Sequence, residues 1–417
     1  MSEPARDRPS LLRGHGGGHA PVSYLELFFD LVYVFAITQV SHFLLKHLSW
    51  NGLAEGALLF LAVWWAWMYT TWAANWAEPE RVPVRIMLLF GMLASMVMAV
   101  AMPRAFAHGE ADRGVLFVCA YLALQVGRTL FMAWAMWRDD RAGAMTMVRI
   151  ACYFAVSALF WFAGAGVENS GRRTMLWLAA LAIEYSGPIM GYRTPFLGRA
   201  TPSDWTISGS HMAERCALFI IIALGEGIIV TGASFADLTP GAAHVAAFLI
   251  AFAGSVLMWW IYFDVGAERG AKHIEHHDEP GRVARNAYTY LHMPIVGGVV
   301  VTAVADALIL EAPEGAAVLG LVLTQCGGLL LFLGGVALFK RFASPLRNLP
   351  LSHLVGAGLL LALGGWSLWR GVPALGFVGC TVGVLALVAL WEWGSFHGGW
   401  EERVSRFMPR VLANLRG

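Results

Sequence analysis

Charged residues are scarce in this chain of 417 residues: Asp, Glu, Lys and Arg make up 14% of it, whereas soluble globular domains contain about 25%. Hydrophobic residues make up 58%, and the mean hydropathy is +0.60. The formal net charge of +1 gives no electrostatic reason to expect a nucleic-acid partner. The composition therefore excludes an ordinary soluble domain and indicates that the main partner is the lipid bilayer.

The sequence also lacks the patterns that mark disulfide, metal and nucleotide sites. Its five cysteines lie in apolar runs without a CxxC pair, so they are expected to be buried thiols. Walker, GxSxG and HExxH patterns are absent. The His-rich stretch 272–279, like His15 and His19, has no tetrahedral ligand spacing and is expected to be solvated. We therefore predict no metal, no cofactor and no catalytic residue.

Long apolar runs are what the chain does have. A helix needs about 20 apolar residues to cross the hydrocarbon core, and lipid cannot satisfy an open backbone. The sequence therefore predicts an all-α polytopic membrane protein with a cytosolic disordered tail over 1–20 and a cytosolic C-terminal tail over 396–417. Twelve spans are expected, near 25–46, 52–74, 84–103, 114–137, 147–165, 174–191, 211–233, 243–265, 286–309, 315–339, 352–369 and 373–394.

The Lys and Arg residues predict the orientation. If the N-terminus faces the cytosol, 21 of the 29 basic residues fall on that side, six fall on the other, and Arg128 and Arg215 lie within spans. Cytosolic loops carry such an excess. We therefore expect a multi-pass protein of the bacterial inner membrane with both termini in the cytosol.

Similar residues recur in the two halves of the chain, which predicts a 6+6 parallel internal repeat over 21–204 and 205–395. Each match is weak alone, but five occur in the same order. The matched positions are Glu26 with Glu214, 64–69 with 259–263, Arg85 with Arg285, Gln125 with Gln325, and Glu184 with Glu392.

Polar residues form a stripe on the first span. At about 100° per residue, Glu26, Asp30, Tyr33 and Ser41 fall within about 80° of one another. Ionisable groups inside a bilayer are costly and are functional candidates. Glu26 is equally well explained as a solvated end residue. Asp30 belongs either to an ion pathway or to a structural ion pair with an intramembrane arginine such as Arg128.

A second set of polar residues lies on the seventh span, where His211, Glu214, Arg215 and Glu226 share one side of the helix. Glu214 and Arg215 alternatively form a local pair. Glu226 stands between two glycines, which let a backbone or an ion approach. The remaining candidates are His292, for which a satisfied hydrogen-bonding role is the main alternative, and the ion-pair or gating residues Arg128, Gln125, Glu184, Asp264 and Asp306.

Two motifs resemble those of the low temperature requirement protein A (LtrA) family. They are the run from Glu26 to Gln39, and His211 to Arg215 followed by 220–226. The resemblance extends over about 20–395 and implies a bacterial inner-membrane protein linked by its name to growth in the cold, without a biochemical activity. Tyr33, Cys216 and Gly227 depart from the usual residues, and Gly227 lacks the hydroxyl that would assist an ion site beside Glu226.

The acidic opening of the first span also resembles the two-repeat potassium channels of endosomes and lysosomes, in architecture only. We therefore expect a channel or secondary transporter for a small cation or proton, with its path between the first and seventh spans. The alternatives are an intramembrane lipid-modifying enzyme using Glu226, His211 and His292, and a structural or regulatory bundle linked to cold growth. The sequence leaves the oligomeric state open, a homo-oligomer included.

Overall fold

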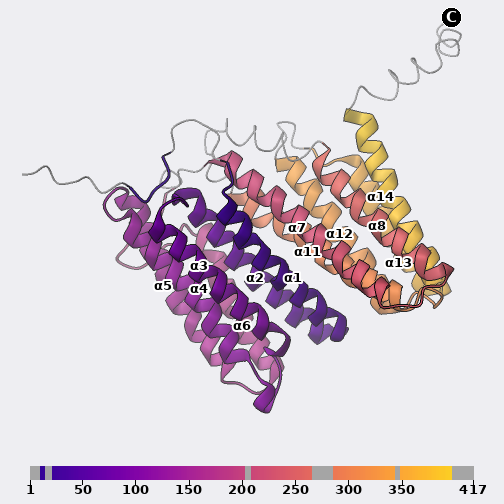
Figure 1. Ribbon diagram of the computed structural model, residues 1–417, viewed down its shortest axis with the longest axis horizontal. Coiled ribbons are helices and arrows are strands. Elements are labelled where there is room, and N and C mark those ends of the chain that lie inside the picture. The colour runs from indigo at the N-terminus through magenta and orange to yellow at the C-terminus, as the bar shows by residue number, and fades with distance from the viewer. Residues whose placement is uncertain (1–9, 15–20, 202–207, 265–284, 343–347, 397–417) are drawn as a thin grey trace, which may run out of the picture. The chain divides into compact units, whose positions relative to one another are not determined.

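The computed structural model describes residues 10–14, 21–201, 208–264, 285–342 and 348–396 of the chain. Over these ranges the regular secondary structure is helical (Figure 1). The long helices are α1 (Tyr24–Lys46), α2 (Trp50–Trp76), α3 (Val82–Ala101), α4 (Gly114–Met136), α5 (Arg141–Ala165), α6 (Ser170–Ile189), α7 (Gly209–Ala236), α8 (Ala242–Phe263), α11 (His292–Glu311), α12 (Leu319–Phe342), α13 (Leu351–Arg370) and α14 (Ala374–Phe396). A π-helical turn, η4 (Arg285–Tyr290), precedes α11.

These helices confirm the prediction of an all-α membrane protein, and each coincides with one predicted span. Eleven of the helices in the described ranges are long and apolar enough to cross a membrane. The exception, α6, carries Arg172, Arg173 and Glu184 in its 20 residues. Two of these three charged side chains, Arg173 and Glu184, are buried against protein. The lower hydropathy of α6 therefore reflects charges that the neighbouring helices cover.

The helices begin where the sequence offers a capping side chain. Ser23 and Glu26 form a capping box at the start of α1, in which each side chain bonds the backbone of the other. Asp140 and Asn169 cap α5 and α6 more simply: one side-chain oxygen of each accepts a hydrogen bond from a backbone nitrogen in the first turn of its helix. Gly371 ends α13 with φ of 65°, the left-handed conformation that glycine adopts without strain.

The chain divides into two compact units. The first contains α1 to α6, α7 as far as Ile222, and η4 as far as Thr289. The second begins in α7 at Ala223 and contains α8 and α11 to α14. In each unit four consecutive helices pack in order, α3 to α6 in one and α11 to α14 in the other. This recurrence is compatible with the internal repeat, which stays a prediction.

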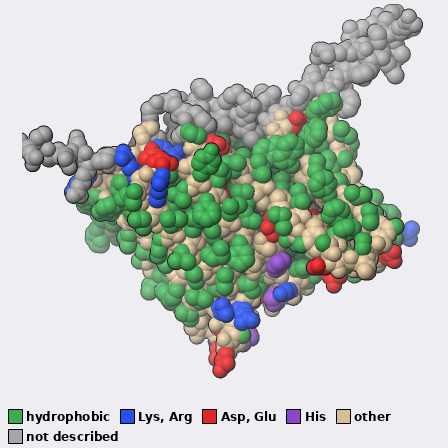
Figure 2. Space-filling view, viewed as in Figure 1, with side chains coloured by type: hydrophobic (Ala, Val, Ile, Leu, Met, Phe, Trp, Pro, Cys, Tyr) green, Lys and Arg blue, Asp and Glu red, His purple; other side chains and the backbone are tan. Residues whose placement is uncertain are grey.

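The surface of the helices is apolar, as a bilayer requires. On the face shown in Figure 2, hydrophobic side chains cover most of the described helices and charged side chains gather towards their ends. Large apolar side chains stand outward along single helices, including Leu89, Leu93, Trp134 and Leu159. An exposed apolar surface of this extent is costly in water and favourable in lipid. The described helices therefore belong to a multi-pass membrane protein.

Glycines bring α11 and α12 into close contact within the second unit. A Cβ atom on Gly298 would lie 2.5 Å from the backbone nitrogen of Phe332, and one on Gly328 would lie 2.5 Å from Oγ1 of Thr302. Helices in membranes associate through such close backbone approach, because lipid supplies no hydrophobic drive.

The predicted tails lie largely outside the described residues, as do His15, His19 and the His-rich stretch 272–279. From the N-terminal tail only 10–14 are described. Within them the backbone nitrogen of Arg13 donates to the carbonyl of Trp76, and Leu12 forms a β-bridge with Ala77. This short piece is therefore held at the end of α2.

Candidate functional site

The polar stripe of α1 faces protein. Glu26, Asp30 and Tyr33 are fully buried, and Ser41 is 7% exposed. The hydroxyl of Tyr33 accepts a hydrogen bond of 3.0 Å from Ser95 on α3. Glu26 is therefore not the solvated end residue that the sequence allowed, because other side chains cover the first turn of α1.

Arg215, on the first half of α7, holds the two carboxylates of this stripe. Its Nη1 lies 3.2 Å from Oε1 of Glu26, and its Nη2 lies 2.6 Å from Oδ1 of Asp30. All three side chains have no exposed surface. Charge-assisted bonds of this kind are strong in a low dielectric. The intramembrane partner of Asp30 is thus Arg215, whereas the sequence had suggested Arg128.

A single tryptophan completes the surroundings of Asp30. Trp67 Nε1 donates a 2.8 Å bond to the oxygen of Asp30 that Arg215 also contacts. The second carboxylate oxygen, Oδ2, is buried and has no hydrogen-bond partner among the described residues. A buried acceptor without a donor is costly. Oδ2 of Asp30 is therefore the place in this cluster where an added proton would find a free lone pair.

His211, one turn before Arg215, is fixed in one tautomer by its neighbours. Asn75 accepts from the backbone nitrogen of Ser208 and donates to its carbonyl, each over 3.0 Å, which sets the orientation of the amide. The amide nitrogen of Asn75 then points at Nδ1 of His211, 3.1 Å away. Nδ1 must accept, so Nε2 carries the hydrogen and donates over 2.8 Å to Glu26. His211 is therefore neutral in this arrangement.

The remaining contacts lead from Glu26 towards the end of α1. Its Oε2 accepts from the backbone nitrogen of Ser23 and lies 3.5 Å from Nη2 of Arg13. Glu214 accepts a 3.3 Å bond from the backbone nitrogen of Val22. The buried network therefore extends from Asp30 through Arg215 and Glu26 to the polar residues that precede α1.

Three of the predicted gating residues meet in a second network of the same unit. Glu184 on α6 accepts from Ser157 over 2.7 Å, from Trp161 over 2.8 Å and from the hydroxyl of Tyr121. Gln125 donates to the same hydroxyl over 3.0 Å.

Gln125 also accepts a bond from Arg128, so one chain of hydrogen bonds runs from Glu184 to Arg128. The direct partners of Arg128 are neutral: the carbonyl of Ala66, Oγ1 of Thr70, and Gln125. Gln125 and Arg128 were predicted separately as candidates, and nothing in the sequence indicated that Tyr121 joins them to Glu184.

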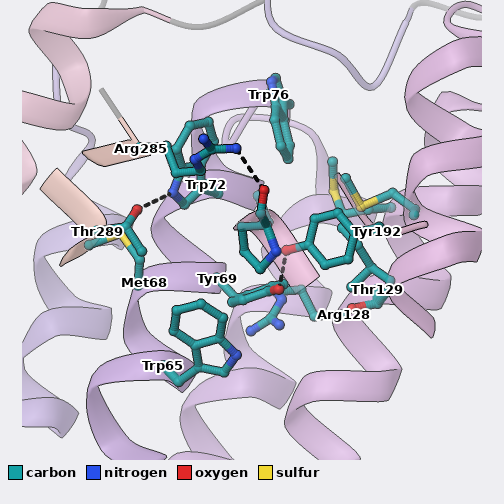
Figure 3. Close-up of a pocket in the computed structure, with 15 residues that line it drawn as sticks. Trp65, Met68, Tyr69, Trp72, Trp76, Arg128, Thr129, Tyr192, Arg285 and Thr289 are labelled. Atoms are coloured by element: carbon teal, nitrogen blue, oxygen red, sulfur yellow. Dashed lines mark hydrogen bonds between the residues drawn. The ribbon is translucent and has the colours of Figure 1, made fainter. Parts of the chain in front are cut away.

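Arg128 also lines a pocket within the first unit (Figure 3). The pocket has about 500 Å³ of empty space, part of it open to solvent. Its walls come from α2, α4, α5, the end of α6 and η4. Aromatic rings dominate, among them Trp65, Tyr69, Trp72 and Tyr192, and a second arginine, Arg285, lies at the same space.

The other candidates lie in the second unit. Glu226 is 8% exposed on α7, and a Cβ on Gly225 beside it would meet nothing within 4 Å. Tyr262 and Nε2 of His292 share a 2.9 Å hydrogen bond, the role that was the main alternative for this histidine. Asp306 is buried on α11. Asp264 is not inside a span as expected: α8 ends at Phe263, and Asp264 is its exposed C-cap.

A buried ion pair of the second unit was not among the predicted sites. Nζ of Lys340 lies 2.6 Å from Oε2 of Glu392, and Nδ1 of His353 lies 3.3 Å from Oε1 of the same carboxylate. Glu392 had been noted only as the counterpart of Glu184 in the repeat. No group of three or more possible metal ligands occurs among the described residues.

Comparisons with known proteins identify the family of this chain. The model of the bacterial low temperature requirement A protein (LtrA) matches residues 21–390. The chain belongs to this family. An uncharacterized protein of Rhizobium meliloti (strain 1021) is 40% identical to it over 391 residues, which is 93% of each chain. No solved structure matches the chain.

Sequence reasoning missed several members of this LtrA protein's buried clusters. Trp67 and Asn75 lie in the Trp-rich stretch of α2, and tryptophans of membrane helices are commonly explained by packing or by a place at the membrane interface. Arg13 lies in the predicted tail. Of these residues, Asn75 could have been found from the sequence, because an amide within an apolar run of a membrane helix needs a polar partner.

Proposed function

We propose that this LtrA-family protein moves protons across the membrane, as a channel or a proton-linked secondary transporter, through the cluster between α1 and the first half of α7. The observation that carries the proposal is the fully buried network of Glu26, Arg215 and Asp30, with one oxygen of Asp30 left without a donor. Intramembrane ionisable groups commonly form proton relays.

Among small cations, the cluster suits a proton better than a metal ion. The guanidinium of Arg215 lies between two carboxylates and carries a permanent positive charge, which repels a cation entering the same space. A proton instead binds to Oδ2 of Asp30 and neutralises the charge that holds Arg215. Protonation therefore weakens the ion pair and supplies a two-state element that opens or closes the path.

Burial of the charges is itself an argument for a role beyond stability. A buried ion pair often stabilises a protein no more than apolar residues of similar size, because both charges must be desolvated. The LtrA-family chain places two carboxylates and an arginine together in a bundle whose buried side chains are mostly apolar. A working role explains the cluster more directly than packing does.

The experiment is flux into liposomes that contain the purified protein, followed with pH-sensitive and K⁺-sensitive dyes. We expect the wild type to carry protons above the level of protein-free liposomes and Asp30→Asn to lose that flux. Asp237→Asn, at an exposed aspartate after α7, is the matched control and keeps it. Identical background flux in wild type and Asp30→Asn for both ions overturns the proposal, and selective K⁺ flux overturns the choice of the proton.

A structural or regulatory bundle is the second candidate, because both carboxylates of α1 are already ion-paired and fully buried. This function predicts that Glu26→Gln and Asp30→Asn alter the unfolding temperature without any accompanying flux. The LtrA family's link to cold growth fits either function. Localisation in the inner membrane with both termini cytosolic, and the 6+6 repeat, belong to the same proposal and are supported by the charge bias and the recurring helix order.

A further inference from the structure

The pocket of the first unit combines aromatic walls with two arginines. The fifteen described residues that line it include Arg128 and Arg285, but no Asp or Glu. Pockets for small organic ligands are mainly apolar with a few placed polar groups. The lining residues of this pocket have that composition.

Arg128 has bonding capacity left for a ligand. It is 3% exposed, and its hydrogen bonds to protein use Nη1 twice and Nη2 once, all with neutral acceptors. A guanidinium has five N–H donors. Nε–H and one N–H of Nη2 are therefore available. In the part of the chain that the structure describes, no carboxylate forms an ion pair with Arg128, and a buried charge in that state favours an anion nearby.

Arg285 supplies the second cation from a different element. Its Nη1 donates over 2.7 Å to the carbonyl of Pro188, which anchors the side chain at the rim formed by α6 (Figure 3). Its Nε is buried and has no acceptor among the described residues. Two arginines from α4 and η4 therefore meet one space, each with an N–H group that a carboxylate or phosphate would satisfy.

The other lining residues favour an apolar group in the part of a ligand that the arginines do not hold. The aromatic side chains of Trp65, Tyr69 and Trp72 and the side chains of Met132 and Met147 line the same space. The hydroxyls of Tyr69 and Tyr192 are hydrogen-bonded to each other, and Trp72 donates to Oγ1 of Thr289, so these polar atoms are already occupied. A flat or aliphatic apolar group fits such a surface better than a sugar or a polar chain.

We propose that this pocket binds an organic anion: one carboxylate or phosphate held by Arg128 and Arg285, on an apolar body that contacts the aromatic wall. Two sources have this chemistry, a water-soluble aromatic carboxylate and an anionic lipid. Binding depends on the pocket alone. That the anion is cargo moved together with a proton rests on the proposed function.

The test uses the full chain in phosphatidylcholine nanodiscs and isothermal titration calorimetry with 2-naphthoate. We expect saturable binding, and at least about tenfold weaker binding of the uncharged 2-naphthamide, because a charge-assisted bond is lost. Arg285→Gln should weaken naphthoate binding by about tenfold and Arg285→Lys by less. Arg149→Gln is the matched control, since Arg149 donates to the carbonyl of Leu197 and does not line the pocket.

Each outcome decides the proposal. If naphthoate binds and added phosphatidylglycerol has no effect, the soluble anion is supported; if phosphatidylglycerol competes, the anionic lipid is supported. Equal binding of naphthoate and naphthamide overturns the proposal. Unchanged binding of naphthoate to a folded Arg285→Gln variant also overturns the proposal. A titration in which naphthoate does not bind the wild type overturns it as well. Naphthoate binding that persists in Asp30→Asn, beside lost proton flux, separates this site from the proton pathway.

Discussion

Arg215 Nη2 lies 2.6 Å from Oδ1 of Asp30, and the two residues are 185 positions apart in the chain. This ion pair ties the first turns of α1 to the start of α7 and is fully buried. It is the closest charged contact in the cluster, and the proposed proton pathway depends on whether it can open.

Removing the arginine should be costly to the fold. Arg215→Gln leaves Asp30 buried without a counter-charge and Glu26 with only Arg13, 3.5 Å away, so we expect a loss of about 3–5 kcal/mol in the free energy of unfolding. Adding Asp30→Asn to this variant should recover part of the loss, because one unpaired charge is removed. Reversible unfolding in mixed micelles measures both.

The control for that cycle is Arg85→Gln. Arg85 and Glu80 form an ion pair on the surface, with side chains 49% and 72% exposed. Its loss should change the free energy of unfolding by less than about 1 kcal/mol. A loss in Arg215→Gln no larger than in Arg85→Gln would contradict the account of the buried pair.

The tautomer of His211 is open to direct measurement. The Asn75 amide faces Nδ1, so nitrogen NMR of isotope-labelled histidine should show His211 neutral with its hydrogen on Nε2. Subtracting the spectrum of His211→Gln identifies its signals. Asn75→Leu removes the donor to Nδ1 and should shift those signals. A spectrum with both nitrogens protonated in the wild type would show that the hydrogen-bond assignment is wrong.

Glu184 should stabilise the fold through the hydrogen bonds that its carboxylate oxygens accept. Three buried donors, from Tyr121, Ser157 and Trp161, converge on its carboxylate. Glu184→Leu leaves Tyr121 and Trp161 without an acceptor and Ser157 with only the carbonyl of Phe154. Since each buried donor left unpaired costs about 1–3 kcal/mol, the variant should be strongly destabilised or fail to fold. Glu184→Gln keeps one carbonyl acceptor and should be clearly milder in a thermal unfolding assay. Equal loss in the two variants would mean that shape, not hydrogen bonding, fixes this site.

Two adjacent glycines of α12 give a matched test of helix packing. A Cβ on Gly328 would lie 2.8 Å from the backbone nitrogen of Thr302 on α11, whereas a Cβ on Gly327 meets nothing within 4 Å. Gly328→Ala should therefore lower the unfolding temperature by forcing α11 and α12 apart, at a cost of about 1–3 kcal/mol. Gly327→Ala should be neutral or slightly stabilising, because alanine favours a helix. The reverse order would contradict the close approach of these helices.

The sequence alone predicted which type of residue forms the site. The stripe of Glu26, Asp30 and Tyr33 follows from helical periodicity, and a polar stripe in a membrane helix must face protein or water. The sequence did not show which arginine pairs with Asp30. Arg128 and Arg215 both lie in apolar spans, and only the folded structure shows that Arg215 is the one that reaches Asp30.

Asp264 shows the opposite limit. The apolar run in the sequence reaches Asp264, so this residue was predicted to lie inside the span. In the structure α8 ends one position earlier, and Asp264 is its exposed C-cap. A shift of one residue at a helix end separates an interior charge from a solvated one, and hydropathy does not resolve boundaries that finely.

The bundle of membrane helices, the positions of these helices and the ionisable residues within them all follow from the amino-acid sequence of this LtrA-family chain, because length, apolarity and helical period are local properties. The folded structure was needed to show that Arg215 neutralises Asp30, that Asn75 holds His211 in one tautomer, and that Arg128 and Arg285 line one aromatic pocket. Those relationships join residues far apart in the chain, and a side chain's partner depends on which helices pack together.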